Sequence, residues 1–287
     1  MQQYKDIISK ILEHGEAAGD RTGTGTKRVF GHHAQFDCSI SFPLVTLKYT
    51  HFPAIVHELL WFISGKTNIE YLQKNNVKIW DEWATDKGEL GPVYGAQWRN
   101  ANGTFRQKIQ GEWVSNGIDQ LKNCIDLIKD SPNSRRIILD SWNPKYLPDP
   151  TMSPKENAAL GLMSLAPCHM FMQFYVSETK RLDMVMYQRS VDTFLGLPFN
   201  IASYALLLTM VAQVTGTTPG TFNWMGGDVH IYNNHREQID LMMERRPLNP
   251  PWIELNPDIT DIDDFTFEDI ILRNYNAHAA IKGKISV

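Results

Sequence analysis

Cys168 is the residue in this sequence best suited to nucleophilic chemistry. It lies in Ala166-Pro167-Cys168-His169, and segment 187–200 adds an arginine, a glutamine, a serine, an aspartate and an asparagine to otherwise apolar sequence. A lone cysteine is most often a small buried hydrophobe. Several polar groups in one short stretch, however, need hydrogen-bond partners or a ligand when they are buried. We therefore interpret this region as a site centred on a thiol.

Glu58 is the second candidate for chemistry. Segment 52–64 is apolar on almost every face and has Pro53 in its first turn, a pattern typical of a buried helix. A buried carboxyl group favours its protonated form. Glu58 is thus the best general acid or base in the chain, and a structural salt bridge is the alternative.

Arginines and aromatic loops indicate a flat, phosphorylated ligand. Segments 79–83 and 91–95 are loop-like and aromatic; indoles often line pockets for flat ligands, although they can equally anchor loops. Arginine forks match phosphate oxygens, and their positive potential favours a thiolate. Segment 20–26 contains Arg21 and is either an anion site or a flexible turn. For Arg135 and Arg136, spacing alone favours a solvated basic turn.

Periodicity predicts the elements that must position these residues in a single domain over 1–287, a length that allows one large core. Segment 146–162 is rich in proline, asparagine and charge and predicts a surface excursion. A capping-box pattern at 67–70 predicts a short helix to about Lys74. The other predicted helices are 4–13, 117–130, 200–214 and 233–243, and the predicted strands are 29–37, 137–139, 170–175, 182–187 and 252–255.

Composition excludes several classes of function. The formal net charge is -4, which offers no general basic surface for DNA. We see no targeting segment at the N-terminus and no apolar stretch long enough to cross a bilayer, so we expect a cytoplasmic protein without membrane contact. The three cysteines form no CxxC pair, and the histidines are scattered, so we predict neither disulfides nor a metal site. Cys168 and His169 are adjacent on a predicted strand and point to opposite faces, which argues against a papain-like pair.

A series of motifs, in order along nearly the whole chain, resembles the thymidylate synthase family. The resemblance implies an α/β fold of the α+β type, in which a large twisted mixed sheet flanked by helices packs against its partner's sheet in a homodimer. It also implies that Arg135 and Arg136 act in trans as phosphate ligands of the partner's site. The matching segments are 20–26, 57–62, 79–83, 91–95, 134–136, 166–169, 187–190, 195–204 and 227–232.

The reaction implied by the resemblance is reductive methylation of dUMP by 5,10-methylenetetrahydrofolate, which gives dTMP and dihydrofolate. Cys168 adds to C6 of the uracil, C5 then attacks the folate's methylene carbon, and tetrahydrofolate supplies the hydride. The implied catalytic residues are Cys168, Glu58, Tyr94, Asn200 and Arg189. The implied substrate-binding residues are Arg21, Arg135, Arg136, Gln188, Ser190, Asp192, Asn200, His230 and Tyr232. The implied folate-binding residues are His51, Ile79, Trp80, Trp83, Leu165, Asp192, Gly196, Phe199 and Val287.

Asn200 favours uracil over cytosine, because its carboxamide supplies an acceptor for N3–H and a donor for O4. A related enzyme could let water capture the exocyclic methylene and make hydroxymethyl-dUMP, or less readily act on dCMP; Trp80, which in the synthase lies near that methylene, favours hydride transfer. The third hypothesis is a folate- or RNA-binding regulator without activity. It predicts loss of the nucleophile or the acid, whereas Cys168 and Glu58 are both present.

Overall fold

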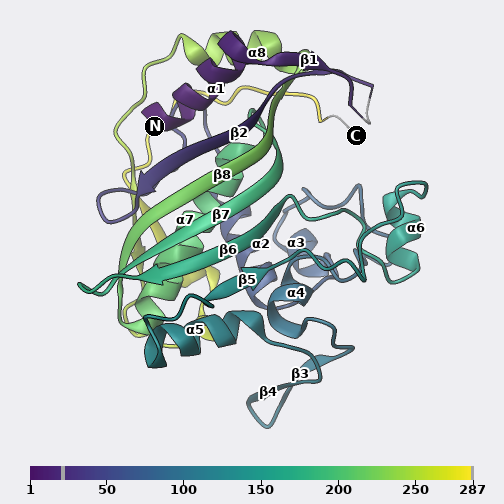
Figure 1. The fold of residues 1–287 in the computed structure, drawn as a ribbon, viewed down its shortest axis with the longest axis vertical. Helices are drawn as coiled ribbons and strands as arrows, with labels where there is room; N and C mark the ends of the chain where they lie inside the picture. Colours follow the sequence, from purple (N-terminus) through teal and green to yellow (C-terminus); the bar gives the residue numbers. More distant parts are fainter. Residues whose placement is uncertain (21–22, 286–287) are drawn as a thin grey trace.

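A six-stranded mixed sheet forms the centre of the molecule in the computed structural model, which describes residues 1–20 and 23–285 (Figure 1). The strand order is β1-β2-β8-β7-β6-β5, with β7 and β8 parallel and the other neighbours antiparallel. The resemblance-based expectation of a large mixed sheet flanked by helices is therefore confirmed. The strands are β1 Glu16–Ala18, β2 Thr26–Asp37, β5 Ile138–Asp140, β6 His169–Val176, β7 Arg181–Asp192 and β8 Thr218–Tyr232.

Two small antiparallel pairs lie outside this sheet. One pairs β3 with β4 and the other pairs β9 with β10. The predicted strand 252–255 is confirmed as β9. The bounds are β3 Arg106–Ile109, β4 Glu112–Ser115, β9 Trp252–Leu255 and β10 Ile270–Arg273.

The predicted helices are present, with shifts at their starts. Asp119 accepts a hydrogen bond from the backbone of Lys122, so the helix predicted at 117–130 begins at Gln120. The capping box predicted at 67–70 does not form, because Asn68 Oδ1 instead accepts from the backbone of Glu70 at 2.9 Å. The helices are α1 Gln2–His14, α2 Phe52–Ile63, α3 Glu70–Lys74, α4 Gly95–Asn100, α5 Gln120–Asp130, α6 Pro154–Ala159, α7 Gly196–Thr215 and α8 Arg236–Met243.

Helix α7 is the centre of the core. By length and composition alone it could cross a membrane, so our expectation that no apolar stretch is long enough was wrong. In the fold, 78% of its most apolar 18-residue stretch is buried inside the protein. Helix α7 is apolar along its length because it is buried between the sheet and α2.

The two faces of the sheet differ. Leu182, Met184 and Met186 alternate along β7 and are buried on the side of α7, as period-two patterning requires. Figure 1 shows α2 and α7 behind the sheet, and no helix of the described chain in front of β6, β7 and β8. Tyr175 is 61% exposed and Met225 is 40% exposed. The open face of the sheet therefore presents large apolar side chains.

Segment 146–162 contains α6 and projects from the side of the molecule (Figure 1). Ser153 and Glu156 close a capping box at the start of α6. Asn157 is buried, and its side chain bonds the backbone of Asp149 in both directions, which fixes the loop to the helix.

Candidate active site

Cys168 lies where the chain enters the sheet at β6. The register of β6 against β7 shifts between His169 and Phe171, and such irregularities re-aim side chains at the end of a strand. The backbone N–H of Cys168 donates to the hydroxyl of Tyr94 at 2.9 Å. The structure thus brings the predicted nucleophile and the predicted tyrosine into direct contact.

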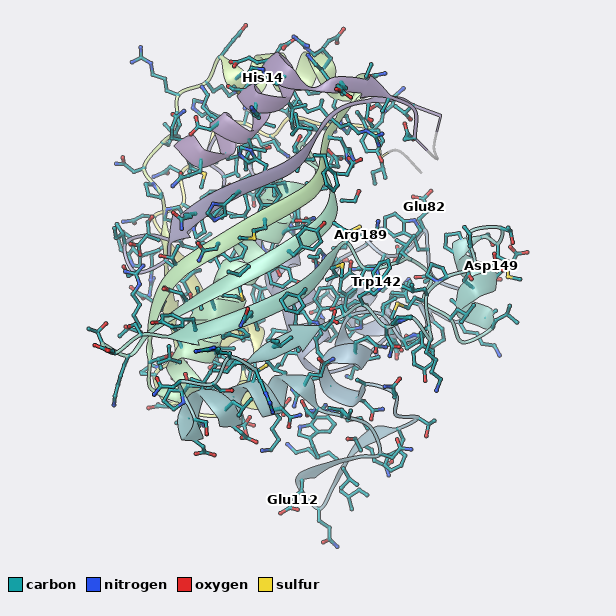
Figure 2. The ribbon with its side chains drawn as sticks, viewed as in Figure 1. His14, Glu82, Glu112, Trp142, Asp149 and Arg189 are labelled. Carbon is teal, nitrogen blue, oxygen red and sulfur yellow. The ribbon has the colours of Figure 1, made fainter. Side chains whose placement is uncertain are left out.

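Arg189 holds the loop that carries the thiol. Its Nε donates to the carbonyl of Pro167 and its Nη2 to that of Ala166, each at 2.8 Å. The same Nη2 lies 3.7 Å from Cys168 Sγ. Figure 2 shows Arg189 at the end of the sheet together with Trp142, whose ring centroid lies 5.6 Å from the guanidinium carbon.

Two opposing effects act on the thiol. Burial raises the pKa of Cys168, and the Arg189 guanidinium lowers it. Burial has the larger effect on the pKa of Cys168. Arg189 is consequently the residue that keeps this thiol closer to its reactive form than burial alone would.

His169 belongs to a buried aromatic cluster. Its ring stacks on Tyr94 with centroids 4.4 Å apart, and Nδ1 pairs with the hydroxyl of Tyr204. Burial lowers the pKa of His169 to about 3, so the ring is neutral. A neutral, buried histidine packed on Tyr94 does not form an ion pair with Cys168, in agreement with the exclusion of a papain-like pair.

Glu58 is buried on α2, as predicted, and faces Trp80. The indole Nε1 of Trp80 donates to Glu58 Oε1 at 2.7 Å. Burial raises the pKa of Glu58 to about 7, although the Trp80 hydrogen bond lowers it. The carboxyl group can therefore gain or lose a proton near neutral pH, which is the property of a general acid or base.

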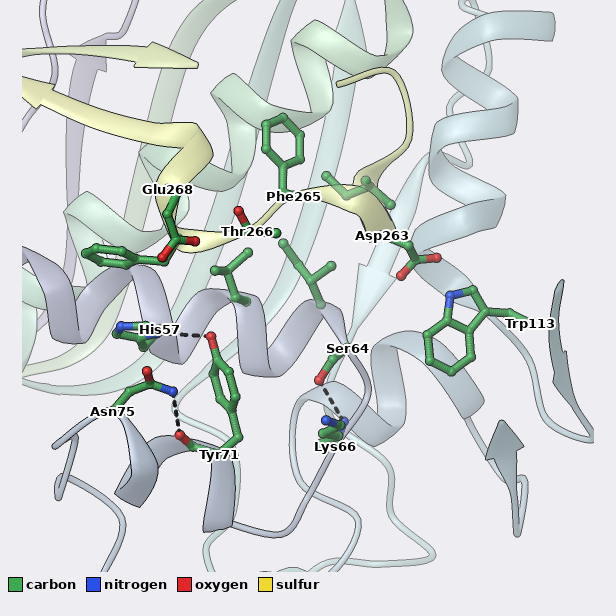
Figure 3. A pocket seen from close by; sticks show the side chains of 14 residues that line it. His57, Ser64, Lys66, Tyr71, Asn75, Trp113, Asp263, Phe265, Thr266 and Glu268 are labelled. Carbon is green, nitrogen blue, oxygen red and sulfur yellow. Dashed lines mark hydrogen bonds between the residues drawn. The ribbon is translucent and has the colours of Figure 1, made fainter. Parts of the chain in front are cut away.

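His57, the preceding residue of α2, faces a different part of the molecule. It lines a cavity of about 350 Å³, where its ring stacks on Phe267 at 4.5 Å and its Nδ1 pairs with Tyr71 (Figure 3). Of the residues predicted for the site, none in the described chain lines this cavity. The two adjacent polar residues of α2 thus lie in separate surroundings, and Glu58 is the one that lies with Trp80 and Tyr94.

Asn200 and Gln188 form a pair at the start of α7. Gln188 Nε2 donates to Asn200 Oδ1 at 2.9 Å. Gln188 is only 2% exposed, so it lies behind Asn200 rather than beside it on the surface of the site. The helix begins at Gly196, before the predicted start at 200. Asp192 Oδ1 accepts from the backbone of Phe194 and Leu195, the two residues just ahead of the helix.

His230 and Tyr232 lie two residues apart on β8 and their rings meet edge to face, with centroids 5.0 Å apart. His230 Nδ1 pairs with Asp228 Oδ1 at 2.9 Å. Arg28 of β2 binds the other oxygen of Asp228 at 2.8 Å. Asp228 thereby fixes the orientation of the His230 ring through Nδ1.

Two of the residues predicted to face the folate, Trp80 and Trp83, are in direct contact. Trp80 and Trp83 meet edge to face at 5.8 Å, while Ile79, Leu165 and Phe199 are exposed or half-buried. Gly196 leaves space beside Asn200, since a Cβ built on it meets only Asn200 Oδ1, at 3.6 Å. Indole and apolar side chains of this kind suit a flat heterocycle.

Some predicted residues are not brought to Cys168 in one protomer. Ile138 is opposite Gln173, so Arg136 lies beside position 175, seven residues beyond Cys168 and about 23 Å away along the strand. Arg135 and Arg136 are both exposed, and no ion pair joins them to another described residue. His51 is exposed at the start of α2. Arg21 and Val287 lie outside the described residues.

Three residues that the sequence reasoning did not single out complete the site: Asp228 behind His230, Tyr204 behind His169 and Trp224 behind Gln188. Asp228 could have been found, because residues two apart on a strand share a face. Tyr204 and Trp224 lie 35 and 36 residues from their partners, and no local pattern indicates them. In the described chain, no group of three or more His, Cys, Asp or Glu residues is placed to hold a metal.

Known proteins similar to this chain match it along its whole length. A family profile described as Thymidylate synthase matches residues 2–287. The chain is 48% identical to the thymidylate synthase of Francisella philomiragia subsp. philomiragia and 50% identical to that of Francisella tularensis subsp. holarctica. Both alignments cover 287 residues, which is 100% of each chain.

Proposed function

The chain belongs to the thymidylate synthase family, and we propose that it converts dUMP to dTMP with 5,10-methylenetetrahydrofolate as co-substrate. The observation that carries this proposal is the group formed by Cys168, Arg189 and Tyr94 beside the buried Glu58. A thiol, a guanidinium and a carboxyl group that titrates near pH 7 supply a nucleophile, an anchor for an anion and a proton carrier.

Cys168 acts first, as the nucleophile that adds to C6 of the uracil. Carbon 6 is a poor electrophile, so the negative charge that develops at O4 must be stabilised by hydrogen bonds. The side-chain amide of Asn200 donates to O4, and Glu58 exchanges a proton there through water. Arg189 binds the phosphate of dUMP with its remaining N–H groups while it continues to hold the Cys168 loop, and Ser190 supports it.

Tyr94 and Glu58 move protons in the following steps. Burial raises the pKa of Tyr94 well above its ordinary value, so its hydroxyl stays protonated and orients the water that takes the C5 proton. Its hydrogen bond to the backbone of Cys168 keeps this hydroxyl next to the reacting carbon atoms. Cys168 leaves at the end, which restores the free thiol.

The folate co-substrate supplies the one-carbon unit and the hydride when it is bound. Trp80, Trp83, Ile79, Leu165 and Phe199 would hold its ring system, and Asp192 would accept from its N–H groups. Gly196 lies beside Asn200, and its missing side chain leaves room next to that amide. His51 and Val287 would contact the more distant part of the molecule. These apolar residues also exclude water from the exocyclic methylene, which favours hydride over hydroxide capture.

We further propose a homodimer in which Arg135 and Arg136 act on the partner's phosphate site. The open sheet face with Tyr175 and Met225 supports this assembly, as does the distance of about 23 Å from Arg136 to Cys168 along the strand. Mixing Cys168→Ala with Arg136→Ala protein tests it. A mixed dimer regains one complete site, so activity should recover to about a quarter of wild type; no recovery on exchange of subunits would contradict it.

A cytoplasmic location completes the proposal. The catalytic thiol and the other two cysteines are free in the structure, and reducing conditions keep them so. No contact with DNA or a membrane is part of the proposed activity.

One reaction mixture tests the proposed chemistry. Protein, dUMP and methylenetetrahydrofolate are combined, and dihydrofolate absorbance is read together with the mass of the nucleotide. Dihydrofolate formed in step with a nucleotide that gains CH2 is the expected result. A nucleotide that gains CH2O without dihydrofolate would assign a hydroxymethylase instead, and no product from wild type or Cys168→Ser would indicate a binding protein.

A further inference from the structure

Trp224 is the buried end of a chain of hydrogen bonds that leads through Gln188 to Asn200, the residue proposed to recognise uracil. Its indole Nε1 donates to Gln188 Oε1 at 3.0 Å, and Gln188 Nε2 donates to Asn200 Oδ1 at 2.9 Å. Trp224 is fully buried and Gln188 is 2% exposed, so solvent does not compete for these bonds.

The chain has a fixed direction because an indole nitrogen can only donate. The atom of Gln188 that faces Trp224 must therefore be its oxygen, which turns the Gln188 amino group toward Asn200. An amino group donates, so Asn200 must present Oδ1 to Gln188. One donor-only group thereby sets the orientation of two amides that could each be reversed at little steric cost.

Gly226 of β8 leaves room for the Trp224 indole beside Gln188. Gly226 is paired with Gln188 in the register of β7 and β8, and Trp224 precedes it by two residues on the same face. A Cβ on Gly226 would lie 2.4 Å from Cη2 of Trp224. The absence of a side chain at Gly226 is what lets the indole extend across it toward Gln188.

We propose that Trp224 is a specificity-determining residue, which selects uracil over cytosine by fixing the orientation of the Asn200 amide. This inference rests on the proposed function, in which Asn200 reads the base. With Oδ1 held by Gln188, its second lone pair accepts uracil N3–H and its amino group donates to O4. The reversed chain would offer a donor to cytosine N3 and an acceptor to its amino group.

Trp224→Phe removes the indole N–H and keeps an aromatic ring in the core. Gln188 can then reverse, and with it Asn200. We expect the ratio of dUMP to dCMP affinity, measured by equilibrium binding and competition, to fall about tenfold. Gly226→Ala keeps the indole but displaces it, and should lower the same ratio. A general loosening of the core would weaken both nucleotides together and leave the ratio unchanged.

Trp98→Phe is the matched control. Trp98 is also fully buried, and its indole donates to Ser141 Oγ at 2.8 Å, away from Gln188. Its loss should leave the ratio as in wild type. An unchanged ratio in both Trp224→Phe and Gly226→Ala, or an equal fall in Trp98→Phe, overturns the inference while the proposed function stands. Wild-type protein that does not prefer dUMP to dCMP overturns both.

Discussion

Trp80 donates its indole N–H to Glu58 at 2.7 Å in a part of the core where both side chains are less than a tenth exposed. This bond stabilises the charged form of Glu58, whereas burial opposes it, and burial is the larger effect. The pKa of about 7 that results is useful for moving protons at neutral pH. Above about pH 7 the buried carboxylate of Glu58 is charged, and this buried charge destabilises the folded protein.

Glu58→Gln should stabilise the fold at alkaline pH. The folded-state pKa of about 7 lies above the unfolded value of about 4.5, so the folded state holds the proton more tightly. This contribution to stability is complete below about pH 4 and is lost as the pH rises to about 7. At pH 8 the variant should be more stable than wild type by up to about 3 kcal/mol, with little difference at pH 4. Urea unfolding at both pH values measures this; an equal difference at both would contradict the raised pKa.

Trp80→Phe should move the titration of Glu58 further toward alkaline pH. The lost N–H no longer stabilises the carboxylate, so the pKa of Glu58 should rise above about 7. The pH dependence of kcat should contain a limb near pH 7 in wild type, shifted upward in Trp80→Phe and absent in Glu58→Gln. Trp83→Phe removes the neighbouring indole, which meets Trp80 edge to face, and should leave the position of that limb unchanged.

The sequence could predict the parts of the site that local patterns specify. Alternation identified β6 and β7 around Cys168, and the apolar segment 52–64 identified Glu58 as a buried acid. The start of α7 was missed because Pro198 is compatible with the first turn of a helix, so an apolar segment with proline can already be helical.

Contacts between distant segments could not be predicted in this way. Trp224 meets Gln188 only because β7 and β8 pair in parallel, and this register is a property of the whole sheet. For Arg135 and Arg136, spacing alone predicts a solvated basic turn, which agrees with their exposure in one protomer. Their proposed role needs a second chain, which no pattern within one chain can specify.

Alkylation should distinguish the three thiols. Burial raises the pKa of Cys38 and of Cys124 to about 12, whereas Arg189 opposes the effect of burial at Cys168. Iodoacetamide at pH 8 should therefore modify Cys168 first, as read by peptide mass spectrometry. Arg189→Gln removes the positive charge beside the thiol, which raises the pKa of Cys168, so its alkylation should slow by up to about tenfold. Cys38 and Cys124 serve as internal references; faster modification of either would contradict the assignment.

Asp263→Asn should destabilise the protein without changing its chemistry. Asp263 binds both amino groups of Arg99, at 2.6 and 2.8 Å, and Arg99 is 2% exposed. Removal of the carboxylate leaves the buried guanidinium of Arg99 with Asp119 as its one carboxylate partner among the described residues, beside the carbonyl of Ile63, and it also takes a partner from Arg106. Such changes cost about 3 kcal/mol. The exposed pair of Lys122 with Asp126 provides the control, because Asp126→Asn should cost less than about 0.5 kcal/mol. Urea unfolding of the two variants gives the comparison, and kcat of Asp263→Asn, measured where it is folded, should equal that of wild type. Equal stability losses in the two variants would mean that the buried position of Arg99 carries no additional cost.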